Sequence, residues 1–336
     1  MATIKDVAKA AGVSFKTVSR VVNGEKRVGN EARERVNQAI RELGYKPTLA
    51  ARQLAGQRSY LIGLLVPRLG ASYIARMLIA MGAACRASGY NLITEMLDYH
   101  EYRRSDFFSI NFSARPDSVI LTPPFSNEER ILDYFEREKV SIVRVAPAFE
   151  GYGLRVPVDE EPIVMELMRH LIAQGHRRIG IIGPPQRRLA SEARVVGYRK
   201  ALAEAGIEED PALILRGDFT FASGVAATTS LLALPQRPTA IFATGDELAA
   251  GAMAEAARLG YRVPDDLAVA GFDDSPIARM VFPPITTVHQ PVREIARAAV
   301  EAAINPDFKP QPFEYQLMIR GSTDGSRQHC LEPYPF

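Results

Sequence analysis

The sequence predicts two kinds of structure in series: a small all-α helix-turn-helix head, and an α/β core of two doubly wound parallel-sheet subdomains. Residues 1–46 show short helical patterns interrupted by glycine and no strand pattern. From residue 60 onward, short apolar runs alternate with helical segments, which is typical of a parallel sheet covered by helices. About eight such runs are too many for one sheet, so we expect two subdomains with a cleft between them. A length of 336 residues suits two or three domains.

The composition is that of a globular protein, with 47% hydrophobic and 24% charged residues. Apolar runs such as LIGLLV are far shorter than the roughly 20 residues that span a bilayer, and charges interrupt the apolar pattern of the amino terminus. We therefore expect a cytoplasmic protein without a signal peptide. Two distant cysteines, Cys85 and Cys330, argue against a disulfide framework and a cysteine zinc site.

Charge is divided unevenly along the chain. Residues 1–58 hold 12 lysines and arginines against five acids, a net charge of +7, whereas the remaining residues carry −5. A basic head on an acidic body predicts a polyanionic partner for the head, such as double-stranded DNA.

The first predicted helix starts after Thr3, a good helix-capping residue, and Asp6 stands where it completes a capping box. Val7 and Ala11 belong to an apolar stripe at helical spacing. Gly12 ends this helix, because glycine readily adopts the left-handed conformation that a tight turn needs.

A second helix begins after Ser14, which caps it, and its Val18 and Val21 point inward. It ends at Asn23-Gly24. Asn30 is expected to cap a third helix, which the glycine after EARERVNQAIREL stops.

Two helices joined by a glycine turn, with polar side chains at the start of the second, form the helix-turn-helix arrangement of DNA-binding proteins. A generic three-helix bundle is the alternative, and the basic charge favours DNA binding. Outward residues near the start of the second helix would reach base edges in the major groove. The residues of the head expected to contact DNA are Thr3, Ser14, Phe15, Lys16, Thr17, Ser19, Arg20, Asn23 and Asn30.

Eight segments of the core have the composition of buried strands, and helical patterns such as PIVMELMRHLIAQG and VVGYRKALAEAG lie between them. These segments are YLIGLLVP, NLITEM, SVILTP, SIVRVAP, RRIGIIGP, ALILRGD, AIFATGD and LAVAGFD.

The segment TIKDVAKAAGVSFKTVSRVVNG resembles the head-piece of the lactose-repressor (LacI) family of bacterial transcription regulators. The resemblance covers nearly the whole chain, since it continues through GYKPTLAARQLAGQRS, GHRRIGIIGPP, RVVGYRKAL, GDFTFASG, GDELAAGAM, VPDDLAVAGFDDSP and PPITTVHQP. It implies a sequence-specific, nucleoid-associated DNA-binding regulator that acts as a homodimer on a pseudo-palindromic operator. It also implies a periplasmic-binding-protein-like core that binds a small effector.

The resemblance implies three crossovers between the two subdomains, which we place near Asp159, Gln290-Pro291 and Arg320. The expected organisation is a helix-turn-helix domain at 1–46, a hinge helix or linker at 47–58, an N-terminal subdomain of 59–159 and 291–318, and a C-terminal subdomain of 160–290 and 319–336.

The hinge segment KPTLAARQLAGQRS holds about eight residues of helix-forming composition between Pro47 and Gly56. So short a helix is marginal in water, and a flexible linker is the alternative. The resemblance implies that it becomes helical on DNA and inserts Leu54 into the minor groove, where an apolar wedge bends the duplex.

Candidate effector-binding residues follow the predicted strands. Asp273 stands at a strand end, where a carboxylate can accept two hydroxyl protons, and the planar fork of Arg194 can bond two adjacent oxygens. Both match the family's ligand-binding positions, although the two could also form a structural pair. Phe219 offers a ring to a sugar face or a base. The full set comprises Ser72, Tyr73, Arg194, Phe219, Asp246 and Asp273.

Two positions depart from the family pattern, because Gly245 replaces a frequent asparagine and Pro123-Pro124 replaces a small hydroxyl residue. We expect a sugar effector, and hence a repressor of carbohydrate-utilisation genes that the sugar releases from its operator. The alternative is a corepressed regulator whose purine or nucleoside stacks on Phe219, with Arg188 at a carbonyl oxygen.

Paired acids, Asp273-Asp274 and Asp246-Glu247, invite comparison with glycosidases, which use two carboxylates. There is no GxSxG, Walker or HExxH motif, and the five histidines lack metal-ligand spacing. We therefore expect no catalytic residue, no metal and no cofactor. A sugar-binding or glycoside-processing protein remains as an unfavoured alternative.

The segment IARMLIAMGAACRASG carries apolar residues on more than one helical face, and the resemblance implies a subunit interface there. A doubly packed core helix is the alternative. We expect regulation by population shift, in which one arrangement of the subdomains spaces the hinge helices for DNA and the effector favours one arrangement. The apolar residues of the segment are Ile74, Met77, Leu78, Met81, Ala84 and Cys85.

Overall fold

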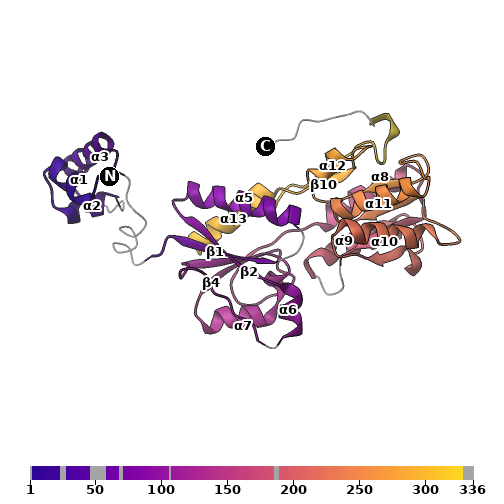
Figure 1. The fold of residues 1–336 in the computed structure, drawn as a ribbon, viewed down its shortest axis with the longest axis horizontal. Helices are drawn as coiled ribbons and strands as arrows, with labels where there is room; N and C mark the ends of the chain where they lie inside the picture. Colours follow the sequence, from indigo (N-terminus) through magenta and orange to yellow (C-terminus); the bar gives the residue numbers. More distant parts are fainter. Residues whose placement is uncertain are drawn as a thin grey trace.

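The computed structural model describes residues 2–22, 28–45, 58–67, 71–105, 107–184 and 189–327. Figure 1 shows a small helical head set apart from a larger core, in which two subdomains of sheet and helices lie side by side. The predicted fold class is confirmed. Asn23, Leu54 and Arg188, which the sequence analysis singled out, lie outside the described residues.

The head is a three-helix unit around a small apolar core. Val7, Val18 and Val36, one from each helix, are fully buried there. Burying a side chain of this size contributes about 1.5–3 kcal/mol, so the three contacts hold the short helices together. The helices are α1 (Ile4–Ala11), α2 (Phe15–Val22) and α3 (Asn30–Leu43).

The helix starts of the head follow the sequence prediction in two cases out of three. The Thr3 hydroxyl accepts the Asp6 amide, and the Asp6 carboxylate accepts the Thr3 amide, so the capping box is present. The Ser14 hydroxyl accepts the amide three residues later at 3.1 Å. The third prediction is wrong by one position, because α3 begins at Asn30 itself and no side chain caps it from Gly29.

The first subdomain of the core has a parallel five-stranded sheet with the order β2-β1-β3-β4-β5. Helices α5 and α13 cover one face, and α6 and α7 cover the other. Its elements are β1 (Leu61–Pro67), α5 (Ala71–Ala87), β2 (Asn91–Leu97), α6 (Tyr99–Arg104), β3 (Ser118–Leu121), the 3-10 helix η1 (Phe125–Asn127), α7 (Glu129–Arg137), β4 (Ser141–Val145), β5 (Leu154–Val156) and α13 (Val292–Ile304).

The second subdomain has a parallel four-stranded sheet with the order β7-β6-β8-β9. Helices α8 and α9 pack on one face, and α10 and α11 pack on the other. Its elements are α8 (Glu161–Ala173), β6 (Ile179–Gly183), α9 (Leu189–Glu204), η2 (Pro211–Leu213), β7 (Ile214–Arg216), α10 (Phe221–Leu232), β8 (Ala240–Ala243), α11 (Asp246–Arg258), β9 (Ala268–Ala270), α12 (Ile277–Met280) and η3 (Gly325–Arg327).

All eight predicted strands are present, and three further strands were not foreseen. These are β5, β10 (Thr287–His289) and β11 (Gln316–Met318), each of three residues. Strands β10 and β11 pair antiparallel at the junction of the subdomains. Leu317 packs against the core of the second subdomain, whereas α13, between β10 and β11 in the chain, packs in the first. The domain boundaries themselves stay a prediction.

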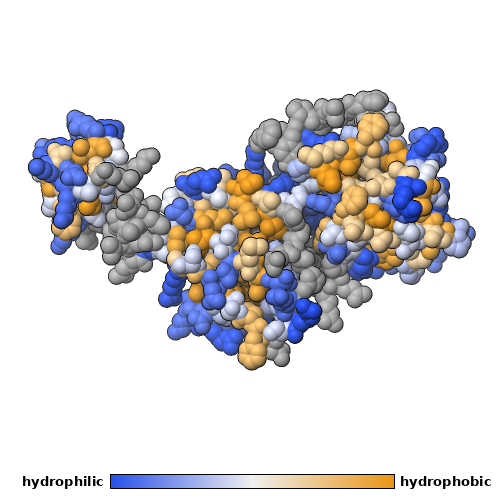
Figure 2. Space-filling view, viewed as in Figure 1, coloured by the Kyte–Doolittle hydropathy of each residue, from blue (hydrophilic) through white to orange (hydrophobic). Residues whose placement is uncertain are grey.

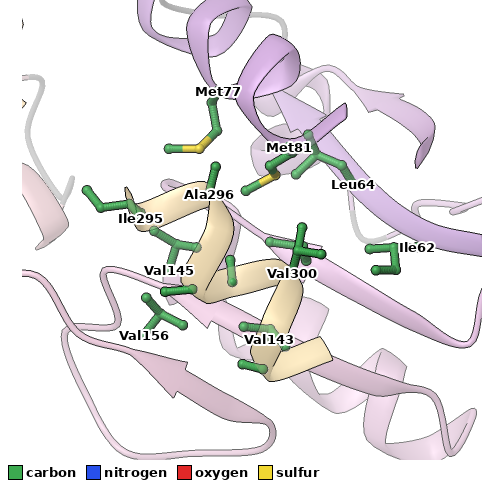
Figure 3. Packing of buried hydrophobic residues seen from close by; sticks show 14 of the residues in the cluster. Ile62, Leu64, Met77, Met81, Val143, Val145, Val156, Ile295, Ala296 and Val300 are labelled. Carbon is green, nitrogen blue, oxygen red and sulfur yellow. The ribbon is translucent and has the colours of Figure 1, made fainter. Parts of the chain in front are cut away.

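The core of the first subdomain depends on close contact between α5 and α13. Figure 3 shows Met77 and Met81 directed toward α13, which presents Ala296 and Val300. All four side chains are almost wholly buried. Small residues on α13 allow the two helices to approach, and flexible methionine side chains fill the remaining space.

No helix in the described part of the chain is both long and apolar enough to cross a membrane.

Candidate functional site

The first candidate site is the exposed face of α2 in the head. Phe15 is 56% exposed, which is unusual for a large apolar side chain unless a binding partner covers it. Lys16 and Arg20 are also exposed. Ser14 and Thr17 hold the helix start, since their hydroxyl oxygens lie 3.0 Å apart. Phe15 and Lys16 thus lie in the first turn of α2 and Arg20 in its last turn, and all three are exposed.

Thr3 caps α1 and so does not belong to α2, and Ser19 lies in the middle of α2. The Thr3 hydroxyl also donates to Asp6 at 2.7 Å, and Ser19 is half-buried. Hydrogen bonds from the backbone and side chain of Thr3 lower the pKa of Asp6 below its usual value. Asn30 is exposed in the first turn of α3.

The second candidate site is a buried polar cluster at the junction of the subdomains, with Arg194 of α9 at its centre. Its guanidinium binds Glu160 in a bidentate pair, with Nε to Oε2 at 2.7 Å and Nη2 to Oε1 at 3.0 Å. Nη1 donates to the carbonyl of Thr244 at 2.6 Å, and the group lies 3.7 Å from the centre of the Phe272 ring. Burial disfavours the charge of Arg194, but Glu160 outweighs burial and raises its pKa.

Asp273, just beyond β9, lies close to this arginine without forming a short pair with it. Oδ1 is 3.8 Å from Nη1 of Arg194 and accepts the side-chain amide of Gln290. Arg76 of α5 donates to the backbone carbonyl of Asp273, which joins the two subdomains. Burial raises the pKa of Asp273 well above its usual range, and the nearby carboxylate of Glu247 adds to the shift.

Phe219 and Asp273 flank one glycine. A β-carbon on Gly245 would lie 3.3 Å from the Phe219 ring and 3.9 Å from Oδ2 of Asp273. The ring therefore stands beside the position where the family pattern has an asparagine. Both residues have left-handed backbones, with φ of 66° and 114°, which residues other than glycine rarely adopt. Such strain concentrates at ligand-binding positions.

Asp246 has a different place from the one expected of an effector contact. Its side chain is fully buried, Oδ2 accepts the Ser275 amide at 2.6 Å, and Oδ1 accepts the Thr287 hydroxyl at 2.6 Å. Burial, together with the charge of Asp273, raises the pKa of Asp246 well above its usual value. The structure thus places Asp246 in the framework that joins α11 to the β9 and β10 region.

Residues of the first turns of α5 close the cluster from the other side. Tyr73 is half-buried, and burial raises the pKa of its phenol, with the carboxylates of Glu160 and Asp273 adding to the effect. Ser72 is half-buried beside it. Tyr315, just before β11, is another buried phenol near Glu160 and Arg194, and its hydroxyl has no hydrogen-bond partner among the described residues.

Sequence reasoning missed four members of the cluster: Arg76, Glu160, Gln290 and Tyr315. Glu160 and Gln290 stand at two of the predicted crossovers, so their places in the chain were a usable signal. Glu160, Arg194 and Asp273 are each less than 10% exposed, so this arrangement of the subdomains closes over them. A cavity of about 790 Å³ lies elsewhere, along α13, and none of the predicted effector residues lines it.

Asp274, next to Asp273, belongs to a separate ionic network that the sequence did not reveal. It binds Arg320 at 2.7 Å, Arg279 at 3.0 Å and Nδ1 of His289 at 3.0 Å. Burial opposes ionisation, but hydrogen bonds from His289 and Arg320 hold the pKa of Asp274 below its usual range. The adjacent acids therefore differ in environment, and this pair does not resemble the two facing carboxylates of a glycosidase.

Three of the apolar residues on which the predicted subunit interface on α5 rested do not reach the surface. Met77, Met81 and Cys85 are buried inside the first subdomain, whereas Ile79 is 74% exposed. Figure 2 shows apolar side chains gathered over α5 and over α12 on the same side of the molecule. On the second subdomain, Met280 is 79% exposed. Each subdomain thus has an exposed apolar residue, Ile79 on α5 in the first and Met280 on α12 in the second.

In the described part of the chain, no group of three or more histidine, cysteine, aspartate or glutamate side chains is arranged to hold a metal ion.

Comparison with known proteins identifies the family and the domain types of the chain. Residues 3–48 match the family model described as bacterial regulatory proteins, lacI family, and residues 168–323 match a periplasmic binding protein-like domain. The HTH-type transcriptional repressor PurR of Shigella sonnei is 34% identical over 320 residues, which is 94% of each chain.

Two solved structures extend the comparison to the fold. The complex of the transcriptional regulator CelR with cellobiose is 30% identical, with a TM-score of 0.68, and the match covers 96% of this chain and 100% of that one. The Lac repressor dimer bound to operator and the anti-inducer ONPF is 26% identical, with a TM-score of 0.73 and coverage of 96% and 99%.

Proposed function

This chain belongs to the LacI family of bacterial regulatory proteins, and we propose that it is a repressor released from its operator by an uncharged sugar. Membership in the LacI family establishes that the protein is a repressor. The protein is a DNA-binding transcriptional repressor that acts as a dimer, binds operator DNA and a small effector, and is not an enzyme. The sugar, the direction of its effect and the residues involved are the proposal.

On the DNA side, Phe15, Lys16 and Arg20 read base edges in the major groove. Their exposure on α2, with Phe15 and Lys16 in the first turn and Arg20 in the last, supports this role. Ser14 and Thr17 set the start of the helix and bring its amides toward the phosphates. Leu54 as the minor-groove wedge and Asn23 as a further contact belong to the proposal on the strength of the family resemblance alone.

On the effector side, the observation that carries the proposal is the placement of Asp273 Oδ2 and the Phe219 ring, both close to the point that a β-carbon on Gly245 would occupy. A carboxylate oxygen that accepts hydroxyl protons, next to an aromatic face, is suited to a sugar ring. The cellobiose bound to CelR, a structural neighbour, agrees with this class of ligand.

The charges of the cluster favour an uncharged effector. Glu160 already neutralises Arg194, and the carboxylates of Glu247 and, when ionised, of Asp273 at least balance Arg76. An anionic sugar phosphate or sugar acid would therefore find no excess of positive charge in this low-dielectric setting, whereas hydroxyl groups would find acceptors.

A purine-responsive, corepressed regulator is the second candidate, because the curated relative PurR is 34% identical over nearly the whole chain. The Phe219 ring would then stack on the base. Arg188, the other residue of this hypothesis, lies outside the described residues.

Regulation by population shift accounts for the closed junction. Arg76 of the first subdomain bonds the backbone of Asp273 in the second, so binding at Asp273 and the relative position of the subdomains are linked. We assign 1–46 to the DNA-binding domain, 47–58 to the hinge, and the rest to the two subdomains with the boundaries expected from the sequence. Because its target is chromosomal operator DNA, we place the protein at the nucleoid in the bacterial cytoplasm.

The deciding experiment measures binding of the purified dimer to a palindromic family-type operator, by fluorescence anisotropy, with a panel of sugars and nucleosides. Release by one neutral sugar is the expected result. Tighter binding with a purine would reverse both the ligand class and the sign, and the absence of operator binding under all conditions would overturn the proposal.

A further inference from the structure

The point at which the linker enters the core is held by one carboxylate, that of Asp117. Oδ1 accepts the backbone amide of Ser59 at 2.6 Å, and Oδ2 accepts the backbone amide of Tyr60 at 2.9 Å. Both oxygens thus bind consecutive amides immediately before β1. Ionised acceptors form stronger hydrogen bonds to amides than neutral ones do.

Asp117 is itself fixed in the sheet. It immediately precedes β3, and its own amide donates to the carbonyl of Leu61, the first residue of β1, at 2.9 Å. One residue therefore makes three hydrogen bonds to the stretch 59–61, at the end of the sheet where β1 and β3 begin.

Tyr90, which immediately precedes β2, also contacts the end of the linker, on the side of β1 opposite β3. The Tyr60 and Tyr90 rings lie 5.5 Å apart, and the Arg58 side chain donates to the Tyr90 hydroxyl at 3.3 Å. The carbonyl of Tyr60 accepts the amide of the first residue of β2 at 2.9 Å. The end of the linker is thus attached to strands on both sides of β1.

We infer that Asp117 is the positioning residue that couples the core to the DNA-binding head, an inference that rests on the proposed function. Residues 46–57 separate the described part of the head from the described part of the core, and Asp117 binds the amides of the second and third described residues on the core side. By fixing where the linker leaves the sheet, Asp117 fixes the separation of the two heads of a dimer. Movement of the first subdomain then reaches the DNA through this point.

Loss of the carboxylate would leave the linker longer by the stretch that Asp117 holds. Each released residue adds up to about 3.3–3.6 Å of reach, which is the distance between neighbouring base pairs. A dimer with loosened linkers should therefore tolerate operators of the wrong half-site spacing, while each head remains intact.

The test compares Asp117→Ala and Asp117→Asn with wild type on three DNAs: a palindromic operator, the same operator with one central base pair inserted, and a scrambled duplex. We expect Asp117→Ala to lower the affinity for the palindromic operator about tenfold. The ratio of its affinities for the palindromic operator and for the operator with the inserted base pair should fall to about threefold or less. Asp117→Asn keeps one acceptor oxygen, so its affinities should lie between those of wild type and Asp117→Ala. The affinity of both variants for scrambled DNA should equal that of wild type. No effector is needed for these measurements.

Asp210→Asn is the matched control, because Oδ1 of Asp210 also accepts a backbone amide, that of Ala212 at 2.9 Å, in the second subdomain. Melting temperature and dimer mass are measured for every variant, and Asp117→Asn decides the matter if the alanine variant melts early. The inference would be overturned if both Asp117 variants are folded dimers and still prefer the palindromic operator over the inserted operator as strongly as wild type does. Failure of wild type to bind any operator would instead overturn the proposed function.

Discussion

Glu160 fills the guanidinium fork of Arg194, with the two short contacts of a bidentate ion pair at 2.7 and 3.0 Å. The sequence led us to expect this fork to meet adjacent hydroxyls of the effector. Its main partners belong to the protein, so the Arg194–Glu160 ion pair is the neutral centre of the cluster, and Asp273 offers the acceptor. The distribution of charge, and not only the identity of residues, thus decides what the site can bind.

Glu160→Gln should destabilise the core by about 3 kcal/mol, because it leaves the buried charge of Arg194 without its counter-ion. Thermal and urea unfolding measure the effect. Glu161→Gln is the matched control, since its pair with Lys200 is largely exposed and should change stability by less than about 0.5 kcal/mol. Equal stabilities for the two variants would contradict the central role of the Glu160 pair.

Effector affinity should rise with pH between about 6 and 8, because burial raises the pKa of Asp273 to about 7 and the ionised form is the better acceptor. Calorimetric titration with the sugar that releases the operator, carried out across this pH range, measures the affinity. Asp273→Asn should bind this sugar about tenfold more weakly and show no dependence on pH. A trend that persists in the variant would assign it to another group.

The raised pKa of Asp273 also makes the stability of the core depend on pH. An acid whose folded-state pKa lies above the unfolded value of 3.8 favours folding while it is protonated, so this contribution is present at low pH and lost as the pH rises through 7. Asp274 has the opposite sign: its lowered pKa contributes stability at neutral pH that is lost as the pH falls below its unfolded value. Urea unfolding of Asp273→Asn and Asp274→Asn at pH values from about 2 to 8 separates the two.

Arg76→Ala should weaken effector binding about three- to tenfold, because it removes the hydrogen bond that joins α5 to Asp273 across the junction. Arg86→Ala, on an exposed part of the same helix, serves as the control. Small-angle scattering of the free variant should show a more open core. Unchanged effector affinity with unchanged scattering would mean that Arg76 does not link the subdomains.

Ile79→Lys should convert the dimer to monomers and thereby weaken operator binding, since a charge would be buried in the apolar face over α5. Light scattering after gel filtration reports the mass. Phe107→Lys is the control, because Phe107 is 89% exposed beside α6, on the side of the first sheet away from α5. A monomeric Phe107→Lys or a dimeric Ile79→Lys would place the interface elsewhere.

Lys16→Ala should change the base preference at one position of each operator half-site, as expected for a side chain that reads a base edge. Selection from a randomised half-site measures the preference, and binding to scrambled duplex serves as the reference. A uniform loss of affinity over all sequences would make Lys16 a phosphate contact.

The sequence by itself determined the head, the order of the long strands and the family. Capping residues, glycine turns and apolar periodicity act over a few neighbouring residues, so Thr3, Gly12 and the strand segments of the core could be recognised from local pattern. Strands β7 and β9 also have three residues, but they lie in longer apolar runs and were predicted. Strands β5, β10 and β11 lie in shorter apolar runs and escaped recognition, because such segments become strands only through pairing partners distant in the chain.

The partners of the polar side chains were decided by tertiary structure alone. Asp246 and Asp273 both follow buried strands and look equivalent in sequence, yet the fold surrounds one with internal donors and leaves an oxygen of the other beside Phe219. Glu160 meets Arg194 across 34 positions of the chain. Electrostatic and hydrogen-bond energies depend on distance and burial in space, which a linear pattern does not specify.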